Sequence, residues 1–217
     1  RATTAMTPLR SLLLLLLGVV AQARVEPSTK IGFADTQSGQ PLVGVGVRKK
    51  GPIKVYGVGL YVDSMGSKMS LSKYKKYKED QSALPKSFFE DLVCGGFGKT
   101  LVLKMAYGVT KEKIAGALGD SIKPRLPAGS SRQSVVEFEQ LLLDGCEKYA
   151  KDGRAGAGTC FTFGVRGSNL GVEVNGKKVG VVHSKPLCQA LLNCYFDAKT
   201  VSQGLRDTCA QGILEML

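Results

Sequence analysis

The sequence has no tryptophan, a single histidine (His183) and no Cys-x-x-Cys pair among its 217 residues. Without close cysteine pairs, the ligand spacing of a zinc site and the motif of a thioredoxin-type redox site are both missing. The lone histidine has no Ser-His-Asp or Cys-His arrangement around it, which favours a structural or surface role. We therefore predict no metal site, no cofactor and no catalytic residue.

The six cysteines are too few for the dense disulfide framework of a small secreted fold, although an even number permits disulfides. Four of them lie in apolar runs: Cys94, Cys160, Cys188 and Cys194. A buried thiol behaves as a small hydrophobic side chain. We interpret these four as core residues.

Charged residues are absent from residues 11–23, an apolar stretch of 13 residues that follows Arg10 and ends in Ala21-Gln22-Ala23. This order is typical of a secretory signal peptide with cleavage after Ala23. A membrane-spanning helix needs about 20 apolar residues, so a membrane anchor or a buried helix is the weaker interpretation. We predict a signal peptide over residues 1–23, one domain over residues 24–217, and entry into the secretory pathway. The destination is then secretion or, in an organism with complex plastids, the plastid.

Acidic residues are scarce, because 18 Asp and Glu stand against 30 Lys and Arg, for a net charge of +12. Arg1 and Arg10 are the only charged residues before residue 24, so the predicted domain keeps a net charge of +10. This balance leaves a nucleic acid, an anionic membrane surface and a small acidic ligand open as partners.

Lysines are densest between residues 68 and 78, where two tyrosines interrupt them. Such a pattern suits a phosphate-binding surface with stacking rings. The run is short, however, and Glu79 and Asp80 dilute it, so we favour a solvated surface of helix and loop and predict no nucleic-acid partner. Transient contact with an anionic membrane is a more coherent use of the charge. The residues concerned are Lys68, Lys73, Tyr74, Lys75, Lys76, Tyr77 and Lys78.

Hydrophobic periodicity predicts an α+β domain with a largely antiparallel sheet and helices on one of its faces. The Asn175-Gly176 pair predicts a tight hairpin, and Gly57 and Gly59 leave room on one side of their strand for another backbone or a ligand. Strands are predicted over residues 30–34, 42–48, 53–62, 100–107, 159–165, 169–174 and 178–183, and helices over residues 85–93, 110–122, 131–149, 186–196 and 200–217.

Three segments, taken in order, resemble the chalcone isomerase-like family: GVGVRKKGPIKVYGVGLYV (residues 44–62), CGGFGKTLVLKMAYGVTKEKIAGAL (94–118) and FTFGVRGSNLGVEVNGKKVGVVHSKPLCQALLNCYF (161–196). The resemblance covers most of the chain from about residue 30 onward. It implies an open-faced β-sandwich, in which a mostly antiparallel sheet is covered by helices. This fold serves plant chalcone isomerases, which close a flavonoid ring, and also non-catalytic members that bind fatty acids.

Most of the isomerase site is unmatched in this chain. The Phe-Thr-Ala run of the isomerases corresponds to Val-Tyr-Gly at residues 55–57, and residues 110–122 contain neither the Tyr nor the Asn that the isomerases carry there. Where a Thr or Ser followed by Met would contact the flavonoid, this chain has Cys194 and Tyr195. The resemblance therefore favours the fatty-acid-binding members.

The resemblance implies that Arg48 and Tyr61 hold a ligand carboxylate in a cleft between the sheet and the helices. A guanidinium fits a carboxylate with two parallel hydrogen bonds, and a phenol adds a third donor. Tyr56 and Lys99 complete the predicted ligand-binding residues, because Tyr56 occupies the position of the isomerase Thr and Lys99 matches a lysine near the isomerase cleft. For Arg48, Tyr61 and Lys99, a purely surface or sheet role is the alternative.

We thus predict a monomer that binds a fatty acid or a related amphipathic carboxylate without chemistry. The alternative function is an intramolecular lyase, with Arg48 polarising the carbonyl oxygen of an enone substrate. A third hypothesis, an interaction protein that assists another enzyme, leaves no mark in the sequence.

Overall fold

The computed structural model describes residues 24–217, and the predicted signal peptide over residues 1–23 lies outside the described residues. Seven strands form one sheet in which each strand pairs antiparallel with the next one along the chain. These strands are β3 (Thr36–Gln37), β4 (Gln40–Lys50), β5 (Ile53–Val62), β6 (Lys99–Met105), β7 (Cys160–Arg166), β8 (Asn169–Val174) and β9 (Lys177–His183). The N-terminal strands β1 (Arg24–Val25) and β2 (Gly32–Phe33) pair separately.

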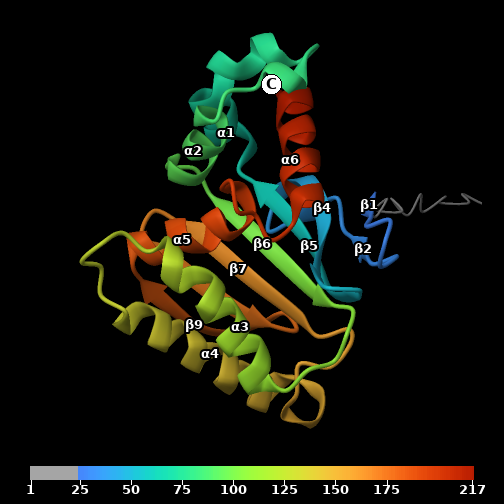
Figure 1. Cartoon of the computed structure of the whole chain (residues 1–217), viewed down its shortest axis with the longest axis vertical. Helices are drawn as coiled ribbons and strands as arrows, with labels where there is room; N and C mark the ends of the chain where they lie inside the picture. The colour runs from blue at the N-terminus through green and yellow to red at the C-terminus, as the bar shows by residue number, and fades with distance from the viewer. Residues whose placement is uncertain (1–23) are drawn as a thin grey trace, which may run out of the picture.

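Six α-helices accompany this sheet: α1 (Ser64–Leu71), α2 (Ser87–Cys94), α3 (Lys111–Ile122), α4 (Gln133–Tyr149), α5 (Lys185–Phe196) and α6 (Gln203–Met216). Short 3-10 turns lie at Ser72–Tyr77 (η1), Gln81–Ala83 (η2), Lys123–Arg125 (η3) and Lys151–Gly153 (η4). Figure 1 shows α3, α4 and α5 in front of the sheet, while α1, α2 and α6 gather at its upper end. Within residues 24–217, every helix is too short or too polar to span a bilayer.

The core divides according to the two faces of the sheet. On the helix-covered face, Tyr56, Val58 and Leu60 of β5 join the main core cluster together with side chains of the helices. On the opposite face, Tyr61 belongs to a smaller cluster with Phe33, Leu42, Val45 and Val102. The predicted α+β fold, a mostly antiparallel sheet covered by helices, is confirmed.

Local signals placed most elements correctly. Asn175 and Gly176 have φ values of 50° and 75°, as a two-residue hairpin turn with left-handed backbone requires. The hydroxyl of Thr110 accepts from the Lys113 N–H at 3.3 Å and begins α3.

Two regions differ from the prediction. The strand predicted over residues 30–34 is reduced to β2, and helix α1, which ends inside the lysine-rich stretch, begins four residues before it. Helix α1 begins at a cap in which Asp63 accepts from the Gly66 N–H at 2.8 Å. Its segment, Ser-Met-Gly-Ser-Lys-Met-Ser-Leu, buries only Ser67 and Leu71. Such a sequence shows little hydrophobic periodicity.

Glycines in β4 allow helix α6 to lie directly against the sheet. Gly44 and Gly46 both face this helix, and a Cβ atom at Gly46 would overlap the backbone N and Cα of Leu205. The close approach lets the Thr208 hydroxyl donate to the Val45 carbonyl at 2.7 Å and accept from the Val45 N–H at 3.0 Å. Helix α6 therefore hydrogen-bonds to the β4 backbone as well as packing on it.

We expect Gly46→Ala to lower the free energy of unfolding by about 1–3 kcal/mol, because the added methyl group overpacks the α6–β4 contact. Gly116→Ala is the matched control, since a Cβ there meets no atom within 4 Å. In helix α3 that change should raise stability by up to about 1 kcal/mol. Urea unfolding followed by circular dichroism measures both, and equal effects of the two variants would contradict the α6–β4 contact.

Candidate functional site

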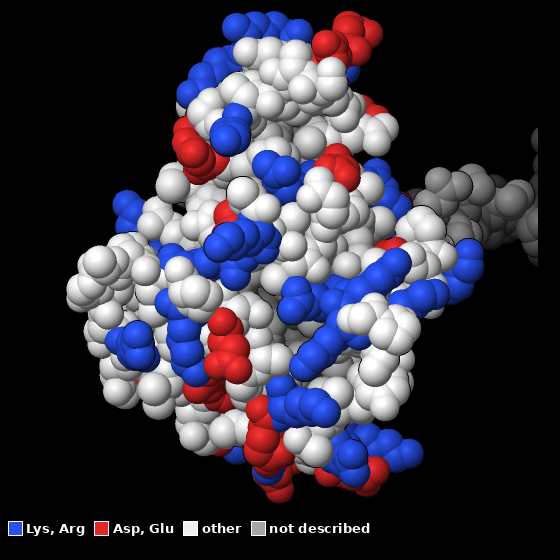
Figure 2. Space-filling view, viewed as in Figure 1, with Lys and Arg blue, Asp and Glu red and all other residues white. Residues whose placement is uncertain are grey.

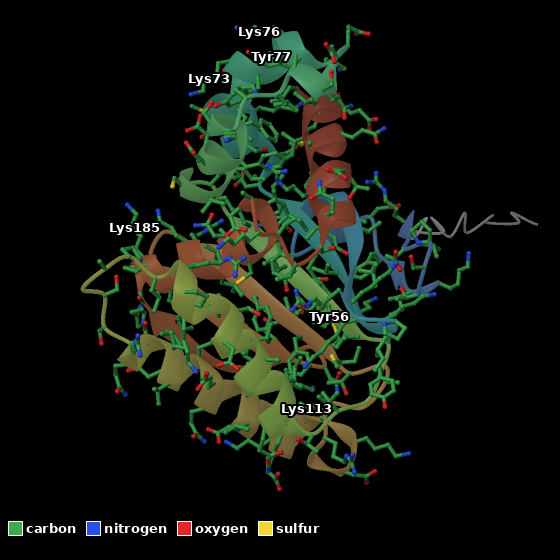
Figure 3. The ribbon with its side chains drawn as sticks, in the orientation of Figure 1. Tyr56, Lys73, Lys76, Tyr77, Lys113 and Lys185 are labelled. Atoms are coloured by element: carbon green, nitrogen blue, oxygen red, sulfur yellow. The ribbon has the colours of Figure 1, made fainter. Side chains whose placement is uncertain are left out.

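A cavity of about 640 Å³ lies between the β4–β5 hairpin and helix α3. This volume is within the usual range of small-molecule sites. Arg48 and Tyr56 line the cavity from the strands, while Lys113 and Asp120 line it from the helix. Figure 3 shows Tyr56 where the sheet approaches α3 and Lys113 near the start of that helix. The remaining walls are mostly apolar and include Val55, Val109, Ile114, Ala117 and Leu118.

A β-bulge at Val55 shapes the strand side of this cavity. The register of the hairpin shifts after Arg48, so that Arg48 pairs with Tyr56 but Lys49 pairs with Lys54. The carbonyl of the extra residue, Val55, accepts from the N–H groups of Ala106 and Tyr107 at 2.9 and 3.1 Å. Because a bulge re-aims side chains, Val55 and Tyr56 line the same cavity although they are neighbours along one strand.

Arg48 lies directly across the hairpin from Tyr56, and most of its side-chain donors have no partner within residues 24–217. Its Nη1 donates to the Val201 carbonyl at 3.5 Å, the limit of a hydrogen bond. Within residues 24–217, the salt bridges of the domain do not involve Arg48. A guanidinium has five N–H donors, so an anion in the cavity would find an unneutralised partner.

Tyr56 and Tyr195 form a buried pair of phenols beside Arg48. Their hydroxyl oxygens are 3.0 Å apart. Burial raises the pKa of Tyr56 to about 12, although the bond to Tyr195 and the charge of Arg48 oppose this rise. Burial also raises the pKa of Tyr195 well above its usual value. Both phenols therefore keep their protons. The bond between the two oxygens uses one hydroxyl proton, so the second hydroxyl proton of the pair remains free to donate to another acceptor.

The structure does not bring Tyr61 together with Arg48, with which it is predicted to hold one carboxylate. Tyr61 follows Tyr56 by five residues and therefore points to the other face of the sheet. Its hydroxyl donates to the Ala34 carbonyl at 2.9 Å, and its ring packs against Phe33.

Lys99 is also remote from Arg48, because it lines a second cavity of about 310 Å³ near Cys94 and Cys188. It precedes Met105, the partner of Tyr56 on the next strand, by six residues, which is roughly 20 Å of strand. Its ammonium donates to the carbonyls of Gly95 and Phe97 at 2.6 and 3.1 Å. Burial lowers the pKa of this amine to about 8.

Tyr195, the hydrogen-bond partner of Tyr56, is not among the ligand-binding residues that the sequence predicts. It lies 139 residues from Tyr56 in the sequence, and its one sequence signal is that it departs from the isomerase pattern at that position. The room predicted beside Gly57 and Gly59 is occupied by Phe33. Its ring covers this face of β5 and would lie 2.8 Å from a Cβ atom at Gly59. A side chain, rather than a ligand, fills the space that Gly57 and Gly59 leave.

The cysteines and the histidine take no part in this site. All six cysteines are free thiols; Cys188 and Cys194 are buried as predicted, Cys160 is half-buried, and Cys94 is exposed. His183 is exposed, with its Nδ1 at 2.7 Å from the amide oxygen of Asn169. Over residues 24–217, His, Cys, Asp and Glu side chains form no group that could hold a metal ion.

Lys99 generates a testable pH dependence. It releases its proton near pH 8 in the folded state and near 10.5 in a model peptide. Between these values the unfolded chain binds more protons, so this residue makes the free energy of unfolding rise with pH. We expect the difference in unfolding free energy between the parent and Lys99→Met to move in favour of the parent from pH about 7 to about 10.

Urea unfolding at a series of pH values measures this difference, and Lys75→Met, which removes an exposed lysine, is the control. A difference that stays constant with pH for Lys99→Met would show that the buried amine does not titrate in this window.

Comparison with known proteins agrees with this architecture. No family model matches the chain. Fatty-acid-binding protein 1 of Arabidopsis thaliana is 28% identical over 193 residues, which cover 84% of this chain and 67% of that protein. The crystal structure of an Arabidopsis thaliana fatty-acid-binding protein superposes with a TM-score of 0.73 and 25% identity, and the match covers 90% of this chain and 98% of the other. The predicted resemblance to the chalcone isomerase-like family is therefore confirmed, and it lies with the fatty-acid-binding members of that family.

Proposed function

We propose that this chain binds a fatty acid or a related amphipathic carboxylate, without chemistry, in the cavity between the β4–β5 hairpin and α3. The carboxylate lies against Arg48 and the Tyr56–Tyr195 pair, and the hydrocarbon chain lies along the apolar wall of α3. The similarity to fatty-acid-binding proteins supports the ligand class. The residues that hold the ligand are argued from the geometry of this chain alone.

One observation carries the proposal: Arg48, which has no carboxylate partner within residues 24–217, lines a mostly apolar cavity together with Tyr56, whose hydroxyl is bonded to that of Tyr195 behind it. An ionised carboxylate accepts several hydrogen bonds and pairs with the flat fork of a guanidinium. The free proton of the phenol pair supplies a further donor. The site therefore offers positive charge and donors in the place where an anionic headgroup needs them, next to a wall that suits its chain.

The same groups argue against catalysis. A general base works best when its pKa is near the operating pH. Burial raises the pKa of Tyr56 to about 12 and that of Tyr195 well above its usual value. Neither phenol is therefore poised to remove a proton from a substrate at neutral pH.

We expect Arg48→Ala to weaken binding of a saturated fatty acid by about 10- to 100-fold, because a hydrogen bond to a charged group contributes about 1.5–3 kcal/mol. Arg48→Lys should restore only part of the affinity, since an ammonium cannot form the two parallel bonds. Isothermal titration with the purified chain and a fatty acid of moderate solubility measures these constants. Native mass spectrometry shows whether a fatty acid co-purifies with each variant.

Tyr56→Phe and Tyr61→Phe form a matched pair of controls, because each removes one buried hydroxyl from β5. Only Tyr56→Phe should weaken fatty-acid binding, by several-fold, since Tyr61 faces the other side of the sheet. Equal losses would contradict the placement of the ligand. A ligand-free chain that cyclises a chalcone faster than buffer would instead support the isomerase alternative.

A further inference from the structure

A strongly basic turn lies beside the proposed cavity. The tip of the β4–β5 hairpin exposes Lys49, Lys50 and Lys54, and no Asp or Glu occurs between Asp35 and Asp63. Within residues 24–217, none of these three lysines belongs to an ion pair. Figure 2 shows Lys and Arg side chains gathered over this part of the molecule. The ammonium of Lys54 donates to the Ser28 carbonyl at 2.5 Å, but within the described residues no acidic side chain neutralises the charge of the hairpin tip.

Two of these lysines oppose each other across the hairpin. Lys49 and Lys54 are partners in the register of β4 and β5. Like charges directly opposite each other destabilise a strand pair. An anionic surface laid over the hairpin tip would remove this repulsion, so the arrangement favours such a partner over bare solvent.

Exposed apolar side chains lie beside Lys50, the lysine of the hairpin tip that lines the cavity. Ile53, at the hairpin tip, is 43% exposed, and Tyr107, in the loop before α3, is 54% exposed. Both line the cavity together with Lys50 and Lys113. Apolar and aromatic side chains set among lysines are typical of surfaces that enter the headgroup region of a bilayer.

The proposed fatty-acid ligand also favours a lipid bilayer as the partner, and this step rests on the proposed function. Each methylene group moved from water into an apolar phase favours the transfer by about fourfold. A fatty acid with a long chain is therefore found in bilayers rather than in water. A protein that takes up such a ligand gains by turning the opening of its cavity toward the bilayer.

We propose that the tip of the β4–β5 hairpin and the loop at Tyr107 dock on an anionic lipid bilayer with the cavity facing it. Lys49, Lys50 and Lys54 contact the lipid headgroups, and Ile53 enters among them. The fatty acid then passes between the bilayer and the cavity without crossing bulk water.

A second basic surface offers a matched control. Lysines of η1 lie at the upper end of the molecule (Figure 3), away from the hairpin. There Lys73 pairs with Asp91 at 2.6 Å, and Glu79 and Asp80 follow the run. Helix α1 beside it exposes Met65 and Met69, but the residues that line the proposed cavity lie elsewhere in the fold. Charge alone would make both surfaces bind, whereas the proposal assigns docking to the hairpin.

The experiment compares Lys49→Ser/Lys54→Ser with Lys75→Ser/Lys76→Ser, two variants that remove equal charge and no residue lining the cavity. Each chain, residues 1–217 in every case, is sedimented with phosphatidylcholine vesicles that contain or lack phosphatidylglycerol. We expect the parent to prefer the anionic vesicles. The hairpin variant should lose about fivefold of this preference for each lysine removed, while the η1 variant should stay close to the parent.

Transfer of a fluorescent fatty acid from the vesicles, followed by stopped flow, should slow in the hairpin variant only. Equal losses in the two variants, or a parent without preference for anionic vesicles, would overturn the docking proposal. Binding of the same fatty acid in vesicle-free solution separates the two hypotheses. If the parent fails to bind there, the proposed function is wrong, whereas normal binding with an unaltered vesicle preference of the hairpin variant refutes the docking alone.

Discussion

Side chains of a strand alternate between the two faces of a sheet, and this constraint decides what the β4–β5 hairpin can do. On one face of β5, Tyr56 joins Arg48 and the helices. On the other face, Tyr61 is enclosed by Phe33. The register of the hairpin shifts at two points, at Val43 and at Val55, and the cavity forms at the second. The site therefore depends on strand geometry before it depends on the chemistry of any residue.

Packing on the two faces holds this geometry in place. Behind β5, the Phe33 ring lies against Gly57 and Gly59, and the ammonium of Lys104 lies 5.1 Å above that ring. On the other face, the missing side chain of Gly46 lets helix α6 pack directly against the backbone of β4. The hairpin is thus fixed from both sides, and such support lets its side chains hold one arrangement without a ligand.

The sequence predicts the sheet well because its signals are local. The strand over residues 53–62 and the turn at Asn175-Gly176 follow from alternation and from the backbone freedom of Asn and Gly. Helix α1 is not predicted, because its apolar side chains are on the wrong face for a periodicity signal. Met65 and Met69 on its outward face are 75% and 76% exposed, while its buried face carries little apolar surface. Periodicity cannot reveal a helix whose hydrophobic side chains point to solvent.

The candidate site could be predicted only in part. The resemblance predicts both Arg48 and Tyr56 but joins Arg48 to Tyr61. In the structure Arg48 is the partner of Tyr56 across the hairpin, and Tyr61, five residues later on β5, faces the other side of the sheet. Tyr195 comes from a helix distant in the sequence, and no local pattern could place its hydroxyl beside that of Tyr56. The bulge depends on the register of two strands, which their separate sequences do not define.

The excess of positive charge is distributed unevenly over this fold. Several exposed cations are paired within the domain, as Lys73 is with Asp91 and Lys123 is with Glu139. The hairpin differs because no acidic residue lies along it, and Lys49 and Lys54 face each other. An arrangement that lowers stability persists where it serves another purpose. Arg48 and these lysines both lack an anion within the described domain, and a carboxylate in the cavity and a bilayer over the hairpin tip would each supply one.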